Sequence, residues 1–169
     1  MWSVMNITEL LLATIDAGYD RRSWHGTNLR GSLRGVSIAE AAWRPAFAKA
    51  SARQALVAHN IWELVIHSAY WKYDIRRRLN GDKGRAFAIE GSNFWTRPLH
   101  GTMQEWKTDL ALLEAEHRTL REAVAGFPEG RWTQKAPGKP FNFEGLVRGV
   151  AAHDIYHAGQ IQLLRALQQ

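Results

Sequence analysis

The chain has 169 residues, a formal net charge of +6 and no cysteine. This length suits one domain with a substantial core, so we expect a single domain over residues 1–169. The hydrophobic fraction of 46% and the eight tryptophans argue against disorder. Without cysteine, the chain has neither a disulfide framework nor a cysteine nucleophile. No apolar run approaches the roughly 20 residues that cross a bilayer and no signal peptide is evident, so we expect a cytoplasmic protein.

The positive charge raises nucleic acid or an anionic ligand as possible partners. The basic residues are scattered, however, apart from the triplet Arg76-Arg77-Arg78. This triplet falls at the end of a predicted helix, where cations complement the helix dipole. A solvated helix end is therefore the favoured interpretation, and recruitment of an anionic cosubstrate is the weaker one. We do not expect nucleic-acid binding, because only the net charge supports it.

The first predicted helix runs from about residue 6 to residue 19, where apolar side chains recur at helical spacing. A Gly-rich connector follows over residues 20–45. Within it, Ser37 and Glu40 have the spacing of a capping box, which indicates a short helical turn. Residues 46–59 are predicted to form a loop with some helical content.

The second predicted helix covers residues 60–79, and Asn60 and Glu63 form a capping pattern at its start. Its apolar positions extend nearly all round the helix, which is typical of a helix covered on more than one side. A homodimer contact is one way to cover it. Gly81 provides a stop, and residues 82–101 are predicted to be a loop.

The third predicted helix begins at the capping box of Thr102 and Glu105 and is the clearest amphipathic helix of the chain. A turn rich in proline and glycine separates it from the fourth predicted helix, residues 142–167. No segment alternates like a strand. Four long helices with a long first connection predict an all-α fold, a four-helix bundle with a long first crossover connection.

The most informative motif is His153-Asp154-Ile155-Tyr156-His157 in the last predicted helix. Two histidines four residues apart share one helix face, with Cβ atoms roughly 6 Å apart. Both lie on the apolar face of this helix, where a buried polar ring without a partner costs about 1–3 kcal/mol. A shared divalent cation is therefore the favoured interpretation, and structural packing is the alternative.

Two histidines rarely complete a metal site, since catalytic zinc usually has three protein ligands. Of the other histidines, only His67 and His117 lie well inside predicted helices. Because bundles place metal sites between facing helices, we favour His67 as the third ligand and keep His117 as its strongest competitor. The alternative role for His67 is a core histidine bonded to a backbone carbonyl.

Asp154 stands where the zincin motif has glutamate, and its shorter side chain makes a zincin assignment poor. It could instead orient a ligand histidine through the other ring nitrogen, or be a solvated helix residue. Glu63, Tyr156 and Gln160 are further candidates for contacts around the ligands, with a plain position on the helix surface as the alternative for each. No catalytic residue is assigned.

Two aromatic pairs, Trp24-His25 and Phe94-Trp95, lie on predicted connectors, where binding residues often collect. They could form the wall of a pocket. Coverage of the core is the favoured interpretation for both pairs.

Residues 152–161, AHDIYHAGQI, closely resemble the C-terminal signature of the DinB-like superfamily. Residues 61–72 are similar to the second helix of that family, which carries a single ligand histidine. The elements at residues 91–95 and 24–26 are similar to features of one branch. The resemblance covers the chain from the first predicted helix to Leu167.

This resemblance implies an up-up-down-down-type four-helix bundle with a long crossover, often assembled as a homodimer. It also implies a divalent metal held by three histidines, which correspond here to His67, His153 and His157. Imidazole ligands suit zinc, nickel, iron or copper, so the sequence does not select the metal. Characterised relatives include transferases and isomerases that use mycothiol or bacillithiol, and the metal-binding module of some sulfoxide synthases.

We therefore expect a metal-dependent enzyme of the thiol-dependent transferase or hydrolase type. A low-molecular-weight thiol and a small electrophile are its expected substrates. A thiol bound to the metal as thiolate would supply the nucleophile that the chain lacks. The alternative is a non-catalytic metal-binding or sensing domain in which the cation is mainly structural.

Overall fold

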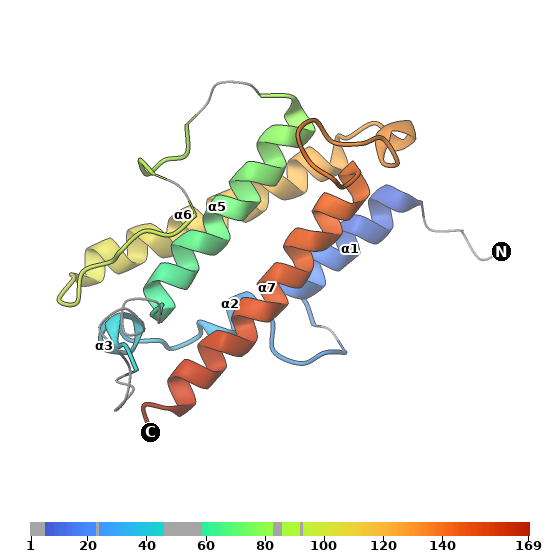
Figure 1. Ribbon diagram of the computed structural model, residues 1–169. Helices are drawn as coiled ribbons and strands as arrows, with labels where there is room; N and C mark the ends of the chain where they lie inside the picture. The colour runs from blue at the N-terminus through green and yellow to red at the C-terminus, as the bar shows by residue number, and fades with distance from the viewer. Residues whose placement is uncertain (1–5, 23, 46–58, 83–85, 92) are drawn as a thin grey trace.

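The computed structural model describes residues 6–22, 24–45, 59–82, 86–91 and 93–169. In these ranges the chain is helical without named strands, which confirms the predicted all-α fold (Figure 1). None of the described helices is long and apolar enough to cross a membrane. The prediction of a loop at residues 46–58 lies outside the described ranges. The elements are α1 (Ile7–Tyr19), α2 (Leu29–Ser32), α3 (Ile38–Ala42), α5 (Ile61–Asn80), α6 (Met103–Ala125), the 3-10 turn η1 (Glu129–Arg131) and α7 (Phe143–Ala166).

The helix ends follow the sequence pattern closely. The capping boxes predicted at Ser37 and Thr102 are both formed, each with the glutamate three residues later. Asn60 caps α5 in one direction only, because its side chain accepts the backbone N–H of Glu63 while the Glu63 carboxylate turns elsewhere. Gly81 ends α5 in the left-handed region at φ 72°, which glycine adopts without a steric penalty.

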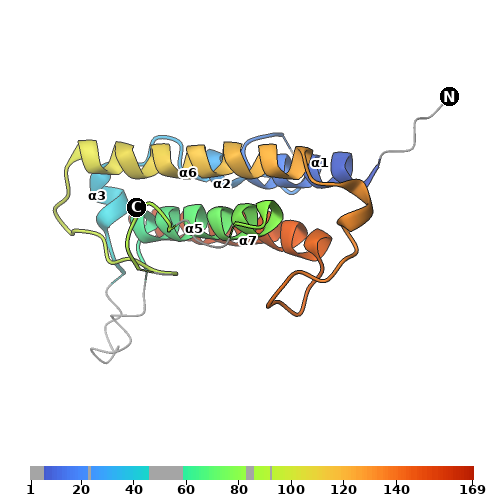
Figure 2. The same ribbon diagram turned by 90° about the horizontal axis from the view of Figure 1, so that it is seen from above.

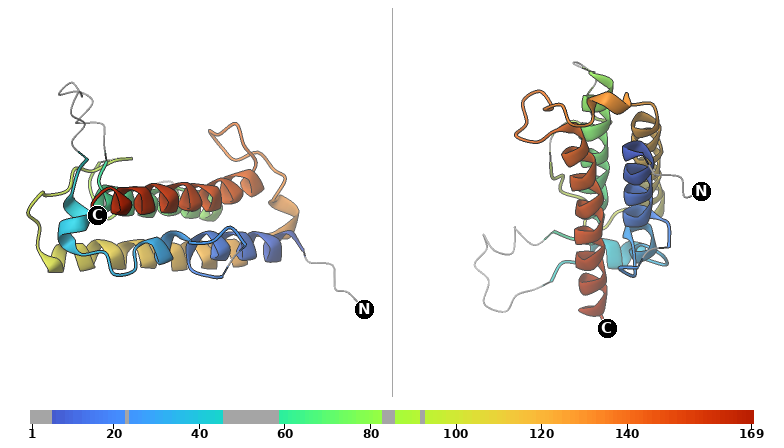
Figure 3. Two further views of the ribbon diagram at one scale, coloured as in Figure 1. Left: turned by 90° about the horizontal axis from the view of Figure 1, so that it is seen from below. Right: turned by 90° about the vertical axis from the view of Figure 1, so that its right-hand side faces the viewer.

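The four long helices form two layers, α1 with α6 and α5 with α7 (Figures 2 and 3). Helix α7 packs on α1 across the layers, and α5 packs on α6. The long first connection, residues 20–60, carries α2 and α3 and leads from α1 to α5 in the other layer. This is the bundle with a long first connection that the sequence predicts.

The direction of the helices differs from the order that the resemblance implies. Helices α5 and α6 run parallel, since Trp62 packs on Trp106 and Arg76 pairs with Glu116 further along both helices. Helices α1 and α7 run the opposite way (Figure 1). The order along the chain is therefore up-down-down-up, because α6 begins beside the N-terminal end of α5, where Trp106 packs on Trp62.

The buried apolar side chains form two clusters. Along α6 and α7, the buried polar residues His117 and Asp154 fall in sequence between residues of one cluster and residues of the other, and the buried Lys72 lies near the end of the first cluster on α5. We call these three residues the polar layer. The buried aromatic residues of the clusters are Tyr19, Trp62, Tyr73, Phe87, Trp95 and Trp106 in the first and Phe127, Trp132 and Phe143 in the second.

The close approach of α1 to α7 depends on a glycine. A Cβ at Gly18 would lie 2.8 Å from the backbone oxygen of Ala151. We therefore expect Gly18→Ala to lower the free energy of unfolding by about 1–3 kcal/mol, since one helix must move. Gly149→Ala is the matched control: a Cβ there meets no atom within 4 Å, so it should stabilise α7 by up to about 1 kcal/mol. Urea denaturation measures both, and equal effects of the two variants would contradict the close approach.

Candidate metal centre

The three histidines favoured from the sequence lie together, one from α5 and two from successive turns of α7. The Nε2 atom of His153 lies 3.0 Å from Nε2 of His67 and 2.9 Å from Nε2 of His157. One ligand atom from each residue lies within 4.8 Å of the other two. His67 and His157 are buried and His153 is half-buried. The antiparallel packing of α5 on α7 brings these residues together across 86 positions of sequence.

The hydrogen bonds of two ring nitrogens define the tautomers of these histidines. Nδ1 of His67 lies 2.6 Å from the backbone oxygen of Asn93. Nδ1 of His157 lies 2.6 Å from the side-chain oxygen of Gln160. Because both oxygens only accept hydrogen bonds, both Nδ1 atoms carry the proton. The Nε2 atoms of His67 and His157 therefore present lone pairs to His153.

This donor set fits a cation. Nε2 of His153 can donate at most one proton. Without a cation, at least one of its two short contacts, with Nε2 of His67 and with Nε2 of His157, would therefore bring two lone pairs together. Nitrogens about 2.0–2.1 Å from a tetrahedral ion lie about 3.4 Å apart, a few tenths of an ångström more than the observed separations. The three-histidine group is thus compatible with a divalent metal, whose identity the geometry leaves open.

The protonation state of the rings also suits metal binding. Burial lowers the pKa of His67 to about 4, although the bond to the Asn93 carbonyl opposes the shift. Burial lowers the pKa of His153 to about 3, with smaller contributions from the other two rings and Lys72. The pKa of His157 is also lowered, again chiefly by burial. All three imidazoles are therefore neutral near pH 7, which is the form that ligates a cation.

The connector after α5 holds His67 from both its edge and its face. The Phe94 ring stacks on His67 with centroids 3.9 Å apart, and His59 stacks on the other face of Phe94 at 3.6 Å. Asn93 adopts a positive φ of 66°, which turns its carbonyl toward the imidazole. Phe94 therefore lines the site, whereas Trp95 is buried in the core. Of the two roles considered for this aromatic pair, the pocket wall applies to Phe94 and coverage of the core applies to Trp95.

A cavity of about 580 Å³ lies directly beside the three imidazoles. Its wall is mainly apolar, with a few polar groups close to the histidines, as in many small-molecule sites. The leucines of this wall are Leu64, Leu163, Leu164 and Leu167, and its polar residues besides the three histidines are His59, Tyr156 and Gln160.

Among the residues expected around the ligands, Gln160 has the clearest position. Its side-chain oxygen accepts from His157, and its Nε2 donates to the Tyr156 hydroxyl at 3.1 Å. Tyr156 is exposed and lines the cavity. Glu63 does not reach the three imidazoles in this way, because its carboxylate binds Arg44 and accepts from the backbone N–H of Arg97.

Both sequence interpretations of Asp154 were wrong. It neither orients a ligand histidine nor meets solvent, but forms an ion pair with Lys72 in which both side chains are 1% exposed. Burial raises the pKa of Asp154 to about 6, although the Lys72 ammonium opposes the shift. In the sequence, Lys72 stands inside a helix that is apolar nearly all round, and this position is the signal that could have indicated a buried ion pair. The pair joins α5 to α7 one residue away from His153.

His117, the competing ligand candidate, lies elsewhere. Its ring stacks on Tyr19 with centroids 3.7 Å apart, and its Nε2 atom is 4.0 Å from Asp16. With Asp16 and Asp20 it forms a second group of potential ligands. Arg121 already pairs with Asp16 through two nitrogens, so this carboxylate is neutralised within the protein.

The arginine triplet is not a solvated helix end. Arg76 pairs with Glu116, and Arg77 and Arg78 both pair with Asp74. All three arginines are half-buried. They stabilise the C-terminal part of α5 and do not line the cavity at the three imidazoles.

The fold and the centre together define an all-α bundle protein with three converging histidines. The chain belongs to the DinB superfamily, whose sequence profile matches residues 21–161, a range that includes His67, His153 and His157. This finding confirms the family resemblance. Neither the curated proteins nor the solved structures contain a significant match to the chain.

His117 predicts a specific acid sensitivity. Burial lowers its pKa from 6.5 to about 3, and Lys72, Arg121 and Arg30 add to the shift. Because the unfolded chain binds this proton more readily, the contribution of His117 to stability is complete above about pH 6.5 and falls as the pH drops toward 3. His117→Phe keeps a ring on Tyr19 without the titration, so we expect a smaller loss of unfolding free energy between pH 7 and pH 4.

Urea denaturation of the metal-free protein at both pH values measures this difference. His100→Phe, at an exposed position outside both histidine groups, is the control and should leave the pH dependence unchanged. An unchanged pH dependence in His117→Phe would contradict the assignment of a buried neutral imidazole.

Proposed function

We propose that the protein is a metal-dependent enzyme of the thiol-dependent transferase or hydrolase type. The observation that carries this proposal is the position of the three imidazoles, which line a cavity of about 580 Å³ and are not enclosed in the core. Three neutral ligands leave a zinc, nickel or iron ion its full charge and at least one open coordination position. Such an arrangement is typical of catalytic sites.

A divalent ion at this centre would supply a Lewis acid that favours ionisation of a bound water or thiol. The chain contains no cysteine, so a thiol nucleophile has to come from a cosubstrate. A cytoplasmic location is part of the proposal, because low-molecular-weight thiols stay reduced there.

The residues of the cavity suit a small, partly apolar electrophile. Leu64, Leu163 and Leu164 would cover its apolar part and exclude water. The Tyr156 hydroxyl accepts a hydrogen bond from Gln160, which leaves its own proton available to a polar group of the substrate. Gln160 keeps the Nδ1 proton of His157 in place and so keeps its Nε2 atom directed to the centre.

The alternative proposal is a non-catalytic metal-binding or sensing domain in which the cation is mainly structural. The packing of the bundle argues against it, because two buried apolar clusters join the long helices independently of the three histidines. We therefore expect the metal-free protein to keep its helices.

The decisive experiment uses protein made without an affinity tag, with zinc, nickel or iron restored, and a panel of low-molecular-weight thiols and electrophiles. We expect thiol-dependent turnover that falls by more than about 100-fold in His67→Ala, since loss of an outer partner alone costs about 10–100-fold. His100→Ala, at an exposed position, should retain full turnover. Absence of turnover with every thiol, water included as nucleophile, would contradict the enzymatic proposal.

Circular dichroism of the same samples separates the two proposals. From the enzymatic proposal we expect metal-free protein and His67→Ala to keep the helical spectrum of the loaded protein. Loss of helix on metal removal would instead support a structural cation.

We also propose a homodimer, as the family resemblance implies. Leu163 on α7 and Leu167, directly after this helix, are 60% and 56% exposed and form an apolar strip beside the cavity. Burial of this strip against a second copy would stabilise association. We expect sedimentation at the mass of two chains and a shift to one chain in Leu163→Glu. A monomeric wild-type protein would contradict the proposal.

A further inference from the structure

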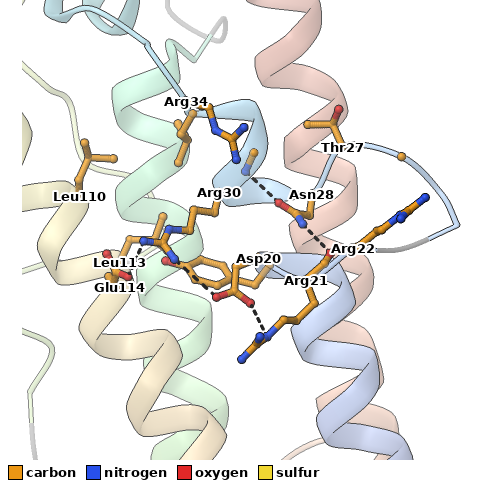
Figure 4. A pocket seen from close by; sticks show the side chains of 14 residues that line it. Asp20, Arg21, Arg22, Thr27, Asn28, Arg30, Arg34, Leu110, Leu113 and Glu114 are labelled. Carbon is orange, nitrogen blue, oxygen red and sulfur yellow. Dashed lines mark hydrogen bonds and ion pairs between the residues drawn. The ribbon is translucent and has the colours of Figure 1, made fainter.

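A second cavity, of about 930 Å³, lies between the C-terminal end of α1, the helix α2 and the middle of α6 (Figure 4). It shares no lining residue with the cavity at the three histidines. Its residues come from α1, α6 and the connector of residues 20–34, so it belongs to a different part of the bundle. Nothing in the proposed reaction uses it.

The charge of this cavity is predominantly positive. Four arginines line it against two carboxylates, Asp20 and Glu114. Arg30 lies 3.6 Å from Asp20 and 3.2 Å from Glu114, and Arg21 lies 3.8 Å from Asp20. Arg21 and Arg30 are therefore already neutralised within the cavity.

The other two arginines, Arg22 and Arg34, have no such partner. In Figure 4 no dashed line reaches either guanidinium group, and neither has a carboxylate within 4.0 Å in the part of the chain that the structure describes. Outside this cavity, every described arginine pairs with a carboxylate, except one that lies over aromatic rings. Those pairing with a carboxylate are Arg44, Arg76, Arg77, Arg78, Arg97, Arg118, Arg121, Arg148 and Arg165, and the one over rings is Arg131.

A buried tyrosine in the wall adds a second observation. Tyr19 is 3% exposed and lines the cavity, yet its hydroxyl makes no hydrogen bond to the described residues. Burial raises the pKa of Tyr19 above its usual range, so the hydroxyl remains a neutral donor. Leu33 and Leu110 provide an apolar part of the same wall.

We propose that this arginine pocket binds a small molecule that carries at least two anionic oxygen groups, phosphate or carboxylate, beside an apolar portion. Guanidinium groups present paired donors that match the oxygens of either group. Arg22 and Arg34 would bind the anionic groups, and the Tyr19 hydroxyl would donate one further hydrogen bond. Leu33 and Leu110 would contact the apolar portion.

The connector beside the pocket offers a spectroscopic reporter. Trp24 is fully exposed, at 102%, so it neither forms a wall of the cavity at the three histidines nor covers the core, the two roles considered from the sequence. It lies two positions from Arg22. Ligand binding in the arginine pocket should therefore change the Trp24 fluorescence, which Trp24→Phe identifies by difference.

Calorimetric titration of the full chain with pyrophosphate and with citrate at low ionic strength tests the proposal. We expect binding of one molecule per chain, weakened about tenfold in Arg34→Gln and in Arg22→Gln, since each loses a charged hydrogen-bond donor. Arg148→Gln is the matched control, because it removes the same charge from an exposed position on α7. Its affinity should stay within about twofold of the wild type, as for a screened rim charge.

The ligand that binds more tightly identifies the anionic group, phosphate for pyrophosphate and carboxylate for citrate. Equal weakening in Arg148→Gln would overturn the proposal, because the binding would then follow only net charge. Absence of binding for both probes would overturn it as well. His153→Ala distinguishes this pocket from the metal centre: binding should be unchanged in this variant, and loss of binding there would assign the anion to the three histidines.

Discussion

The three-histidine site depends on which ring nitrogen carries the proton in His67 and in His157. His67 donates from Nδ1 to the Asn93 carbonyl and His157 donates from Nδ1 to Gln160, so both Nε2 lone pairs face His153. Burial keeps the imidazoles neutral, and among the described residues no carboxylate lines the cavity beside them to offset a proton. A cation at the centre would remove the repulsion between the lone pairs. The hydrogen bonds of the two Nδ1 atoms thus determine what the Nε2 atoms of the same rings can bind.

The polar layer determines how precisely α5 and α7 face each other. Removing Lys72 alone would leave the Asp154 carboxylate buried without a counter-charge, and such losses cost about 3–5 kcal/mol. Because Asp154 follows His153 directly, the ion pair with Lys72 also limits movement of His153 relative to α5. Tyr19 extends this layer, since its ring lies 4.8 Å from the Lys72 ammonium and stacks on His117. Tyr19 therefore contacts the core of the bundle and also lines the arginine pocket.

Much of this arrangement follows from local sequence patterns. Helical periodicity and capping predicted the long helices, and the four-residue spacing of His153 and His157 predicted their shared face. His67 required the further principle that bundle sites lie between facing helices. The Lys72–Asp154 pair could not be predicted because it depends on the register between α5 and α7. Asn93 and Phe94 lie on an irregular connector, in which Asn93 has a positive φ. Periodicity gives no information about the roles of residues on such a connector. The helix order that the family resemblance implied was wrong, and connector lengths alone do not determine helix direction.

X-ray absorption at the metal edge of the loaded, untagged protein tests the central claim most directly. Three imidazole nitrogens should scatter at about 2.0–2.1 Å for zinc, with the outer-ring scattering that identifies histidine, and their number should fall in His153→Ala. A spectrum of the wild-type protein dominated by oxygen ligands, without histidine scattering, would contradict the account.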